Sequence, residues 1–186
     1  MKKPLSLLLP VALFFTVSAV AGEFPDDWTW DTGSDAPHRA EHATLEGKTM
    51  PGIDVTGWMN GQVTSADMKG KVVVLDFYAS WCPVCMSCIS DNNYYQHKYK
   101  DKGLLLVGIC TNKNGQENMA QVVQSRGILY PTARDPKLVS ENTWHVHYYP
   151  TYAVIDRKGI VRCVGLQPQY LDLVIQKLLA EPVPKN

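Results

Sequence analysis

Short apolar runs recur along the middle and C-terminal parts of the chain. They cover 72–78, 104–110, 151–155 and 160–164, and a single acid, Asp76, interrupts the first of them. Runs of this length, rich in Val, Ile and Leu and bounded by polar or turn residues, are typical of strands buried within a sheet. We therefore predict a strand at each place, with the last two joined as a hairpin by the turn residues 156–159.

Amphipathic segments lie between and after these runs. We predict helices over 86–100 and 117–126, which end at Gly103 and Gly127, and a short helix around 137–144. A last helix carries one apolar face, formed by Leu171, Val174, Ile175, Leu178 and Leu179. Helices that alternate with strands predict an α/β fold in which helices flank a central mixed β-sheet.

The first 21 residues have the pattern of an export signal. Lys2 and Lys3 precede an uncharged apolar segment, 4–20, and the last three residues read Ala-Val-Ala. This pattern predicts a secretory signal that is cleaved after Ala21, and the alternative is an uncleaved membrane anchor. The protein is therefore expected to be periplasmic or secreted, or membrane-anchored in the alternative.

The charge of the chain bears on its partners, and its length bears on the number of domains. Loss of Lys2 and Lys3 leaves 16 basic against 18 acidic residues, and such a balance disfavours nucleic acid as a partner. We interpret 22–48, which has little periodicity, as an extended lead-in, and 49–186 as one domain. Within that domain, 49–69 predicts an N-terminal β-hairpin extension with Asn60-Gly61 as its turn.

The end of the first apolar run carries the candidate chemistry. The sequence WCPVC, residues 81–85, follows the predicted strand, and Pro83 fits the first turn of a helix. A helix N-terminus stabilises a thiolate, and a three-residue spacing lets two cysteines form a disulfide. We expect Cys82, nearer the helix tip, to attack a substrate disulfide, and Cys85 to resolve the mixed disulfide.

These motifs resemble a known family. WCPVC after VVVLDFYAS is similar to the active site of thioredoxin-fold proteins, in particular the TlpA/ResA/CcmG-like extracytoplasmic thiol-disulfide oxidoreductases. The resemblance runs from about Thr49 to about Ala180 and includes LLLVGIC, ILYPTARD and YYPTYAVIDRKGIV. It implies a thioredoxin fold and an enzyme that exchanges disulfides or dithiols of exported proteins without a cofactor. It also implies an electron-donating thiol-disulfide partner, which can be membrane-bound.

The resemblance gives a role to Asp76. A carboxylate within an apolar strand is costly to bury unless it is protonated or has a function. Thioredoxin has an aspartate at the matching place, beneath the resolving cysteine. The resemblance therefore implies that Asp76 has a raised pKa and takes the proton of Cys85 through a water molecule.

The resemblance also implies a substrate-binding surface around Pro150. In YYPT this proline matches the cis-proline that thioredoxin folds place opposite the two cysteines, so that Tyr149 can pair with an extended substrate. Trp81 is expected to shield the disulfide, and the alternative is a residue of the core. Pro83 and Val84 complete this surface, and they lack the histidine that helps hold the thiolate in strongly oxidising relatives, which favours a reductase.

In two alternative hypotheses the cysteines bind a metal instead of exchanging disulfides. A copper-handling protein would take Cys82, Cys85 and Met86 as soft ligands and close the site with His145 or His147. An iron–sulfur cluster or a zinc site is disfavoured. Cys82, Cys85 and Cys88 begin like a ferredoxin cluster motif, but Asn92-Asn93 stands where that motif needs Cys-Pro. Zinc would need a second pair of ligands, and only His97 lies near in the sequence. On the oxidoreductase hypothesis we expect neither a metal nor another cofactor.

Three further cysteines are not assigned to the redox pair. Cys88 is interpreted as a small buried apolar side chain, and the alternative is a third redox thiol. Cys110 and Cys163 are expected on strands at opposite edges of the sheet, where they cannot pair.

Overall fold

A computed structural model describes residues 23–31, 33 and 36–184 of the chain. The predicted leader, residues 1–21, lies outside the described residues. Within the described part, no helix is both long and apolar enough to cross a membrane.

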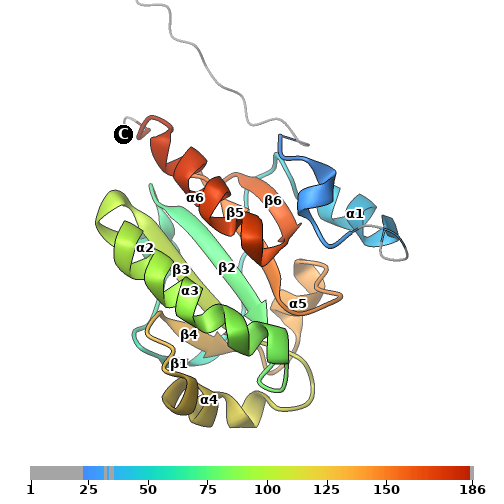
Figure 1. The fold of residues 1–186 in the computed structure, drawn as a ribbon, viewed down its shortest axis with the longest axis vertical. Helices are drawn as coiled ribbons and strands as arrows, with labels where there is room; N and C mark the ends of the chain where they lie inside the picture. The colour runs from blue at the N-terminus through green and yellow to red at the C-terminus, as the bar shows by residue number, and fades with distance from the viewer. Residues whose placement is uncertain (1–22, 32, 34–35, 185–186) are drawn as a thin grey trace, which may run out of the picture.

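Strands and helices alternate through most of the chain (Figure 1). The strands are β1 (Thr56–Met59), β2 (Val72–Tyr78), β3 (Leu104–Cys110), β4 (Thr132–Arg134), β5 (Thr151–Ile155) and β6 (Val161–Leu166). The helices are α1 (Ala36–Ala43), α2 (Ser65–Met68), α3 (Pro83–Tyr99), α4 (Met119–Arg126), α5 (Val139–Thr143) and α6 (Leu171–Ala180), with short 3-10 turns at Asp26–Trp28, Lys100–Lys102, Gln116–Asn118 and Pro168–Tyr170.

The six strands form one mixed sheet in the order β1-β4-β3-β2-β5-β6. Strands β2, β3 and β4 run parallel to one another, whereas β1, β5 and β6 pair antiparallel with their neighbours. The predicted α/β fold with a central mixed sheet is confirmed. Strand β2 lies in the middle of the sheet and is buried along its whole length, which agrees with a run that is apolar except at Asp76.

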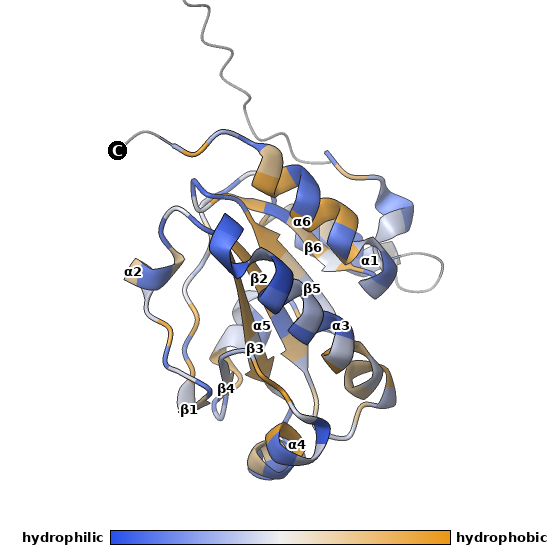
Figure 2. Ribbon diagram, turned by 60° about the vertical axis from the view of Figure 1, so that its left-hand side comes forward, coloured by the Kyte–Doolittle hydropathy of each residue, from blue (hydrophilic) through white to orange (hydrophobic). Residues whose placement is uncertain are grey.

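The two faces of β2 belong to two apolar clusters. Val72, Val74 and Tyr78 face the cluster that includes apolar side chains of α3 and α6, and these helices cross that side of the sheet in Figure 1. Val73 and Phe77 face the other cluster, which includes Trp144. In Figure 2 the central strands are largely apolar, whereas the helices around them mix polar and apolar residues. Side chains alternate between the two faces of a strand, so Asp76 points to the same side as Val74 and Tyr78. Its carboxyl group therefore lies in the layer beneath α3.

The predicted hairpin about Asn60-Gly61 is wrong. Both residues have positive φ, as a tight turn needs, but β1 pairs with β4 rather than with the segment after the turn. That segment forms α2 instead, because Thr64 and Asp67 build a capping box at its N-terminus. Asn60-Gly61 therefore predicted the turn correctly but not the strand pairing, because the partner of β1 is distant in the sequence.

The interpretation of 22–48 as extended is also wrong. This segment contains α1, and it packs on β6 through an isolated bridge between Thr29 and Leu166. The side chain of Arg39 binds both carboxylate oxygens of Glu46, at 2.9 and 2.6 Å, and Glu46 also accepts a hydrogen bond from the backbone of Val164. These polar contacts hold the segment in place without the apolar periodicity that would have indicated a helix.

Cys110 and Cys163 are buried and unpaired, as expected. The expectation that their strands lie at opposite edges is wrong, however. Cys163 is on the edge strand β6, but Cys110 is on β3, which lies inside the sheet. Burial raises the pKa of both thiols, which makes them poor nucleophiles at neutral pH.

Candidate active site

The two cysteines of the motif form a disulfide at the N-terminus of α3. Cys82 is the N-cap residue, and its Sγ atom accepts a hydrogen bond of 3.2 Å from the backbone N–H of Cys85. Pro83 occupies the first turn, where its missing N–H costs nothing. A thiolate on Cys82 would keep this donor and would also lie at the positive end of the helix dipole.

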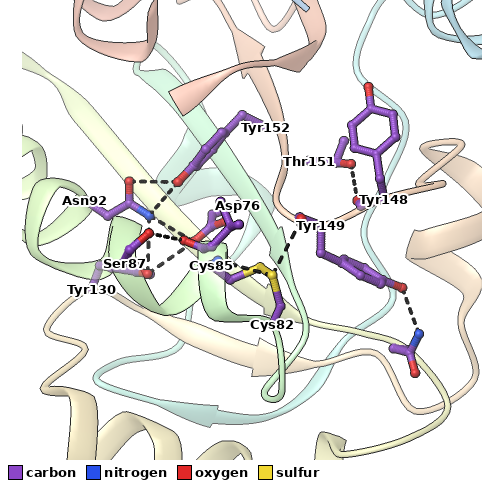
Figure 3. The surroundings of a disulfide bond; sticks show 12 residues. Asp76, Cys82, Cys85, Ser87, Asn92, Tyr130, Tyr148, Tyr149, Thr151 and Tyr152 are labelled. Atoms are coloured by element: carbon purple, nitrogen blue, oxygen red, sulfur yellow. Dashed lines mark hydrogen bonds between the residues drawn. A yellow bond between two sulfur atoms is a disulfide. The ribbon is translucent and has the colours of Figure 1, made fainter. Parts of the chain in front are cut away.

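Tyr149, the residue before Pro150, lies opposite the disulfide (Figure 3). The peptide bond between them is cis, and the carbonyl oxygen of Tyr149 is 3.5 Å from Sγ of Cys82. Trp81 has 57% of its surface exposed, and its ring is edge-on to that of Tyr149 with the ring centroids 6.0 Å apart. Pro83 and Val84 are exposed at the helix tip. The structure thus brings the predicted substrate-binding residues together around the disulfide.

Glu141 fixes the position of the Tyr149 side chain. One of its carboxylate oxygens accepts hydrogen bonds from the Tyr149 hydroxyl at 2.6 Å, from the Thr111 hydroxyl at 2.7 Å and from the backbone N–H of Asn112 at 2.9 Å. Because these donors come from the end of β3 and from the loop before β5, the carboxylate of α5 connects the two segments next to the disulfide.

Asp76 lies in a buried polar cluster beneath α3. Its Oδ2 atom accepts hydrogen bonds from the Asn92 amide at 3.0 Å and from the Tyr130 hydroxyl at 3.2 Å, and Asn92 also bonds to the Tyr152 hydroxyl. In Figure 3 the carboxyl group of Asp76 lies between Asn92 and the disulfide. The Oδ1 atom of Asp76 has no hydrogen-bond partner among the described residues. One carboxyl oxygen is therefore held in place while the other stays available.

Burial gives Asp76 an unusual protonation equilibrium. Loss of hydration raises the pKa of this carboxyl group to about 7, although the hydrogen bonds from Tyr130 and Asn92 oppose the rise. A group with such a pKa exchanges protons near neutral pH, as a general base or acid must. Asp76 is thus buried with a raised pKa, as the sequence predicts.

Sequence reasoning missed the residues that support the site. Asn92 could have been found, because it lies on the same buried face of α3 as Cys85 and Ile89, where a polar residue stands out among apolar ones. Tyr130, Tyr152 and Glu141 come from distant segments, and no local pattern of the chain marks them.

Cys88 is buried one turn after Cys85 and forms no disulfide. Burial raises the pKa of its thiol, which agrees with the interpretation of a small buried side chain. His145 and His147 contact Glu41 rather than the redox cysteines, at 3.6 and 2.7 Å. In the oxidised state described here, the geometry does not support the copper site of the alternative hypothesis.

Comparisons with known proteins agree with this geometry. The model of the AhpC/TSA family matches residues 47–164. A solved structure described as a thiol:disulfide interchange protein, thioredoxin family protein from Chlorobium tepidum TLS is 31% identical, with a TM-score of 0.55, and the match covers 62% of this chain and 85% of that one.

Two groups of curated relatives are similar in sequence. Thiol-disulfide oxidoreductase ResA of Bacillus cereus is 28% identical over 71% of this chain and 78% of that protein. Protein DipZ of Mycobacterium tuberculosis is 32% identical over 58% of this chain, but the match spans only 17% of DipZ. The similarity to DipZ therefore concerns one part of a much longer protein.

Proposed function

We propose that this chain, a member of the AhpC/TSA family with a thioredoxin fold, is a thiol-disulfide oxidoreductase that reduces disulfides of exported proteins. The observation that carries the proposal is the Cys82–Cys85 disulfide at a helix N-terminus, 3.5 Å from the backbone carbonyl before a cis-proline. That carbonyl belongs to Tyr149, and an extended substrate peptide would pair with the backbone at this residue. The partners are disulfides or dithiols of exported proteins.

The reaction transfers two electrons from the dithiol to a substrate disulfide. The Cys82 thiolate attacks one substrate sulfur, forms a mixed disulfide and releases the other substrate sulfur as a thiolate. Cys85 then loses its proton and attacks Sγ of Cys82, which breaks the mixed disulfide and releases the second substrate thiol. The enzyme ends as the disulfide that the structure contains, and a dithiol partner must reduce it before the next cycle.

Asp76 acts in the second step. Its ionised form accepts the proton of Cys85 through a water molecule, and its pKa of about 7 lets it return that proton near neutral pH. The Asn92 and Tyr130 hydrogen bonds hold the carboxyl group through this exchange.

The direction of electron flow and the location are part of the proposal. The apolar Pro83-Val84 pair adds no positive charge next to the thiolate, so the dithiol is less stabilised than in strongly oxidising relatives, which favours reduction of substrates. The export pattern of residues 1–21 favours the periplasm or secretion, with a membrane anchor as the alternative.

Trapping of mixed disulfides tests the assignment of the two thiols. Cys85→Ser should accumulate substrate complexes through Cys82, because the resolving thiol is lost, whereas Cys82→Ser should accumulate few. Cys88→Ser, one helical turn further on, is the matched control and should behave as the wild type. Equal trapping by Cys82→Ser and Cys85→Ser would contradict the assignment.

Equilibration with a series of glutathione buffers tests the direction. A reductase should have a potential nearer to that of thioredoxin, about −270 mV, than to that of strong periplasmic oxidants, about −120 mV. A value near the oxidants would reverse the proposed direction while leaving the thiol assignment intact.

A further inference from the structure

A cluster of metal-ligating side chains lies away from the redox pair. The ligand atoms of His38, Glu41 and His147 are all within 4.8 Å of one another. Glu41 is in direct contact with His147, at 2.7 Å between Oε2 and Nε2, and the rings of His38 and His147 stack with centroids 3.9 Å apart. In a tetrahedral zinc site, ligand atoms lie about 3.3 Å apart, because each is about 2.0 Å from the ion. Side-chain rotations that part the two stacked rings would bring the ligand atoms to that spacing.

His145 lies beside this group of three and would supply a fourth ligand after its side chain rotates. Its Nδ1 atom is 3.6 Å from the same Glu41 oxygen that His147 contacts. The backbone of His145 has a φ of 53°, a left-handed conformation that is uncommon outside glycine but that histidine adopts more often than most residues. In this conformation, His145 and His147 both turn toward α1.

The two segments that carry these ligands are already held together. His42, one turn after His38 on α1, is fully buried and bonds to the carbonyl oxygen of His145 at 2.9 Å. Its other ring nitrogen is 2.7 Å from Asp31, so both nitrogens are occupied and His42 is not itself a ligand. Ligands on a preformed frame lose less conformational freedom when an ion binds, which favours binding.

We propose that His38, Glu41, His145 and His147 bind one divalent transition-metal ion of the zinc and copper class. Three imidazole nitrogens and one carboxylate oxygen match the ligands that these ions prefer, whereas magnesium and calcium prefer oxygen alone. All four side chains are partly exposed, so an ion can enter from solvent. The site is distinct from the Cys82–Cys85 pair and does not depend on the proposed reductase activity.

A bound ion would connect α1 to the loop before the cis-proline. His147 precedes Tyr149, whose carbonyl faces Cys82, so the ion would restrain the segment that presents the substrate-binding backbone. A bound ion would thus affect the redox site through the position of this loop, without exchanging electrons with the cysteines.

Calorimetric titration of the untagged, oxidised protein with zinc chloride tests the proposal. The disulfide must be intact so that the Cys82 and Cys85 thiols do not compete for zinc. We expect one equivalent to bind, and His147→Ala and Glu41→Gln each to weaken binding by more than about 100-fold, since even residues behind the ligands contribute about 10- to 100-fold. His97→Ala, an exposed histidine on α3, is the matched control and should bind as the wild type.

A second measurement avoids any variant. In NMR spectra of the wild type, zinc should shift the ring signals of His38, His145 and His147 and leave that of His97 unchanged. Absence of saturable binding, unchanged binding in His147→Ala, or equal loss in His97→Ala would each overturn the proposal. In each case the cluster would be only a surface hydrogen bond between Glu41 and His147 with two histidines beside it.

Discussion

Replacement of Asp76 by asparagine is the sharpest test of the buried carboxyl group. Asparagine keeps the size of the side chain and an oxygen that can accept the hydrogen bonds of Asn92 and Tyr130. It cannot ionise, however, and its amide N–H groups face the place where Oδ1 of Asp76 has no described partner. The substitution therefore removes the titration and adds a buried, unpaired donor.

The sign of the pH effect follows from the raised pKa. The carboxyl pKa rises from 3.8 to about 7 on folding, so the unfolded chain releases this proton at lower pH than the folded protein. Stability is therefore lost as the pH rises from about 4 to about 7, and is level above that. The loss amounts to about 4 kcal/mol of the free energy of unfolding, since each pKa unit corresponds to about 1.4 kcal/mol.

The variant should lack this loss but bear the cost of the unpaired amide, about 1–3 kcal/mol at every pH. Asp76→Asn should thus be less stable than the wild type by about 1–3 kcal/mol at pH 4, and more stable by a similar amount at pH 8. Urea unfolding of both oxidised proteins, followed by tryptophan fluorescence from pH 4 to pH 8, measures the difference. Asp91→Asn, which changes an exposed acid of α3, controls for the loss of a charge.

Parallel pH profiles for the wild type and Asp76→Asn would refute the reasoning, because they would mean that Asp76 titrates alike in the folded and unfolded states. The catalytic role has a separate readout. Release of a preformed mixed disulfide at pH 7 should slow by about 100-fold in the variant, the lower end of the range for loss of a general base. An unchanged release rate would leave Asp76 with a structural role only.

Two further predictions concern residues outside the redox pair. Cys88→Ala should keep insulin reductase activity within about twofold, because burial raises the pKa of Cys88 and the resolving step does not need it; a tenfold loss would instead indicate a third redox thiol. Arg162→Met should lower the free energy of unfolding by about 3 kcal/mol in urea titrations at pH 7, because it leaves buried Asp156 without its cationic partner; an unchanged midpoint would contradict this.

The central sheet and the redox pair were predictable because their signals are local. The buried strands read as continuous apolar runs, and WCPVC places two thiols and a proline at a helix start within five residues. Asp76 was recognisable for the same reason, as one acid within an apolar strand. Each of these features depends on neighbours in the sequence, so the sequence alone is enough to find it.

The features that were missed depend on distant pairs. Strand β1 finds its partner in β4, and no turn signal near Asn60 reports that pairing. Glu141 supports Tyr149 from another element, and Arg39 binds Glu46 through side chains that look like ordinary solvent-exposed charges in the sequence. Hydrophobic periodicity cannot reveal buried polar contacts of this kind, because it scores such residues as exposed.

Two groups of contacts hold the loop before the cis-proline. One comes from residues that match the AhpC/TSA family, and the other comes from residues before that match. Glu141, within the matched residues 47–164, anchors the Tyr149 hydroxyl. Asp31, before the matched region, accepts a hydrogen bond of 2.6 Å from the Tyr148 hydroxyl and also contacts His42, which bonds to the carbonyl oxygen of His145. The redox pair therefore lies within the residues that match the family, whereas part of the support for the substrate-binding loop comes from a segment before them. Because that support sets the position of the Tyr149 carbonyl opposite Cys82, we expect the N-terminal segment to influence which substrates the oxidoreductase accepts, rather than the chemistry of its two thiols.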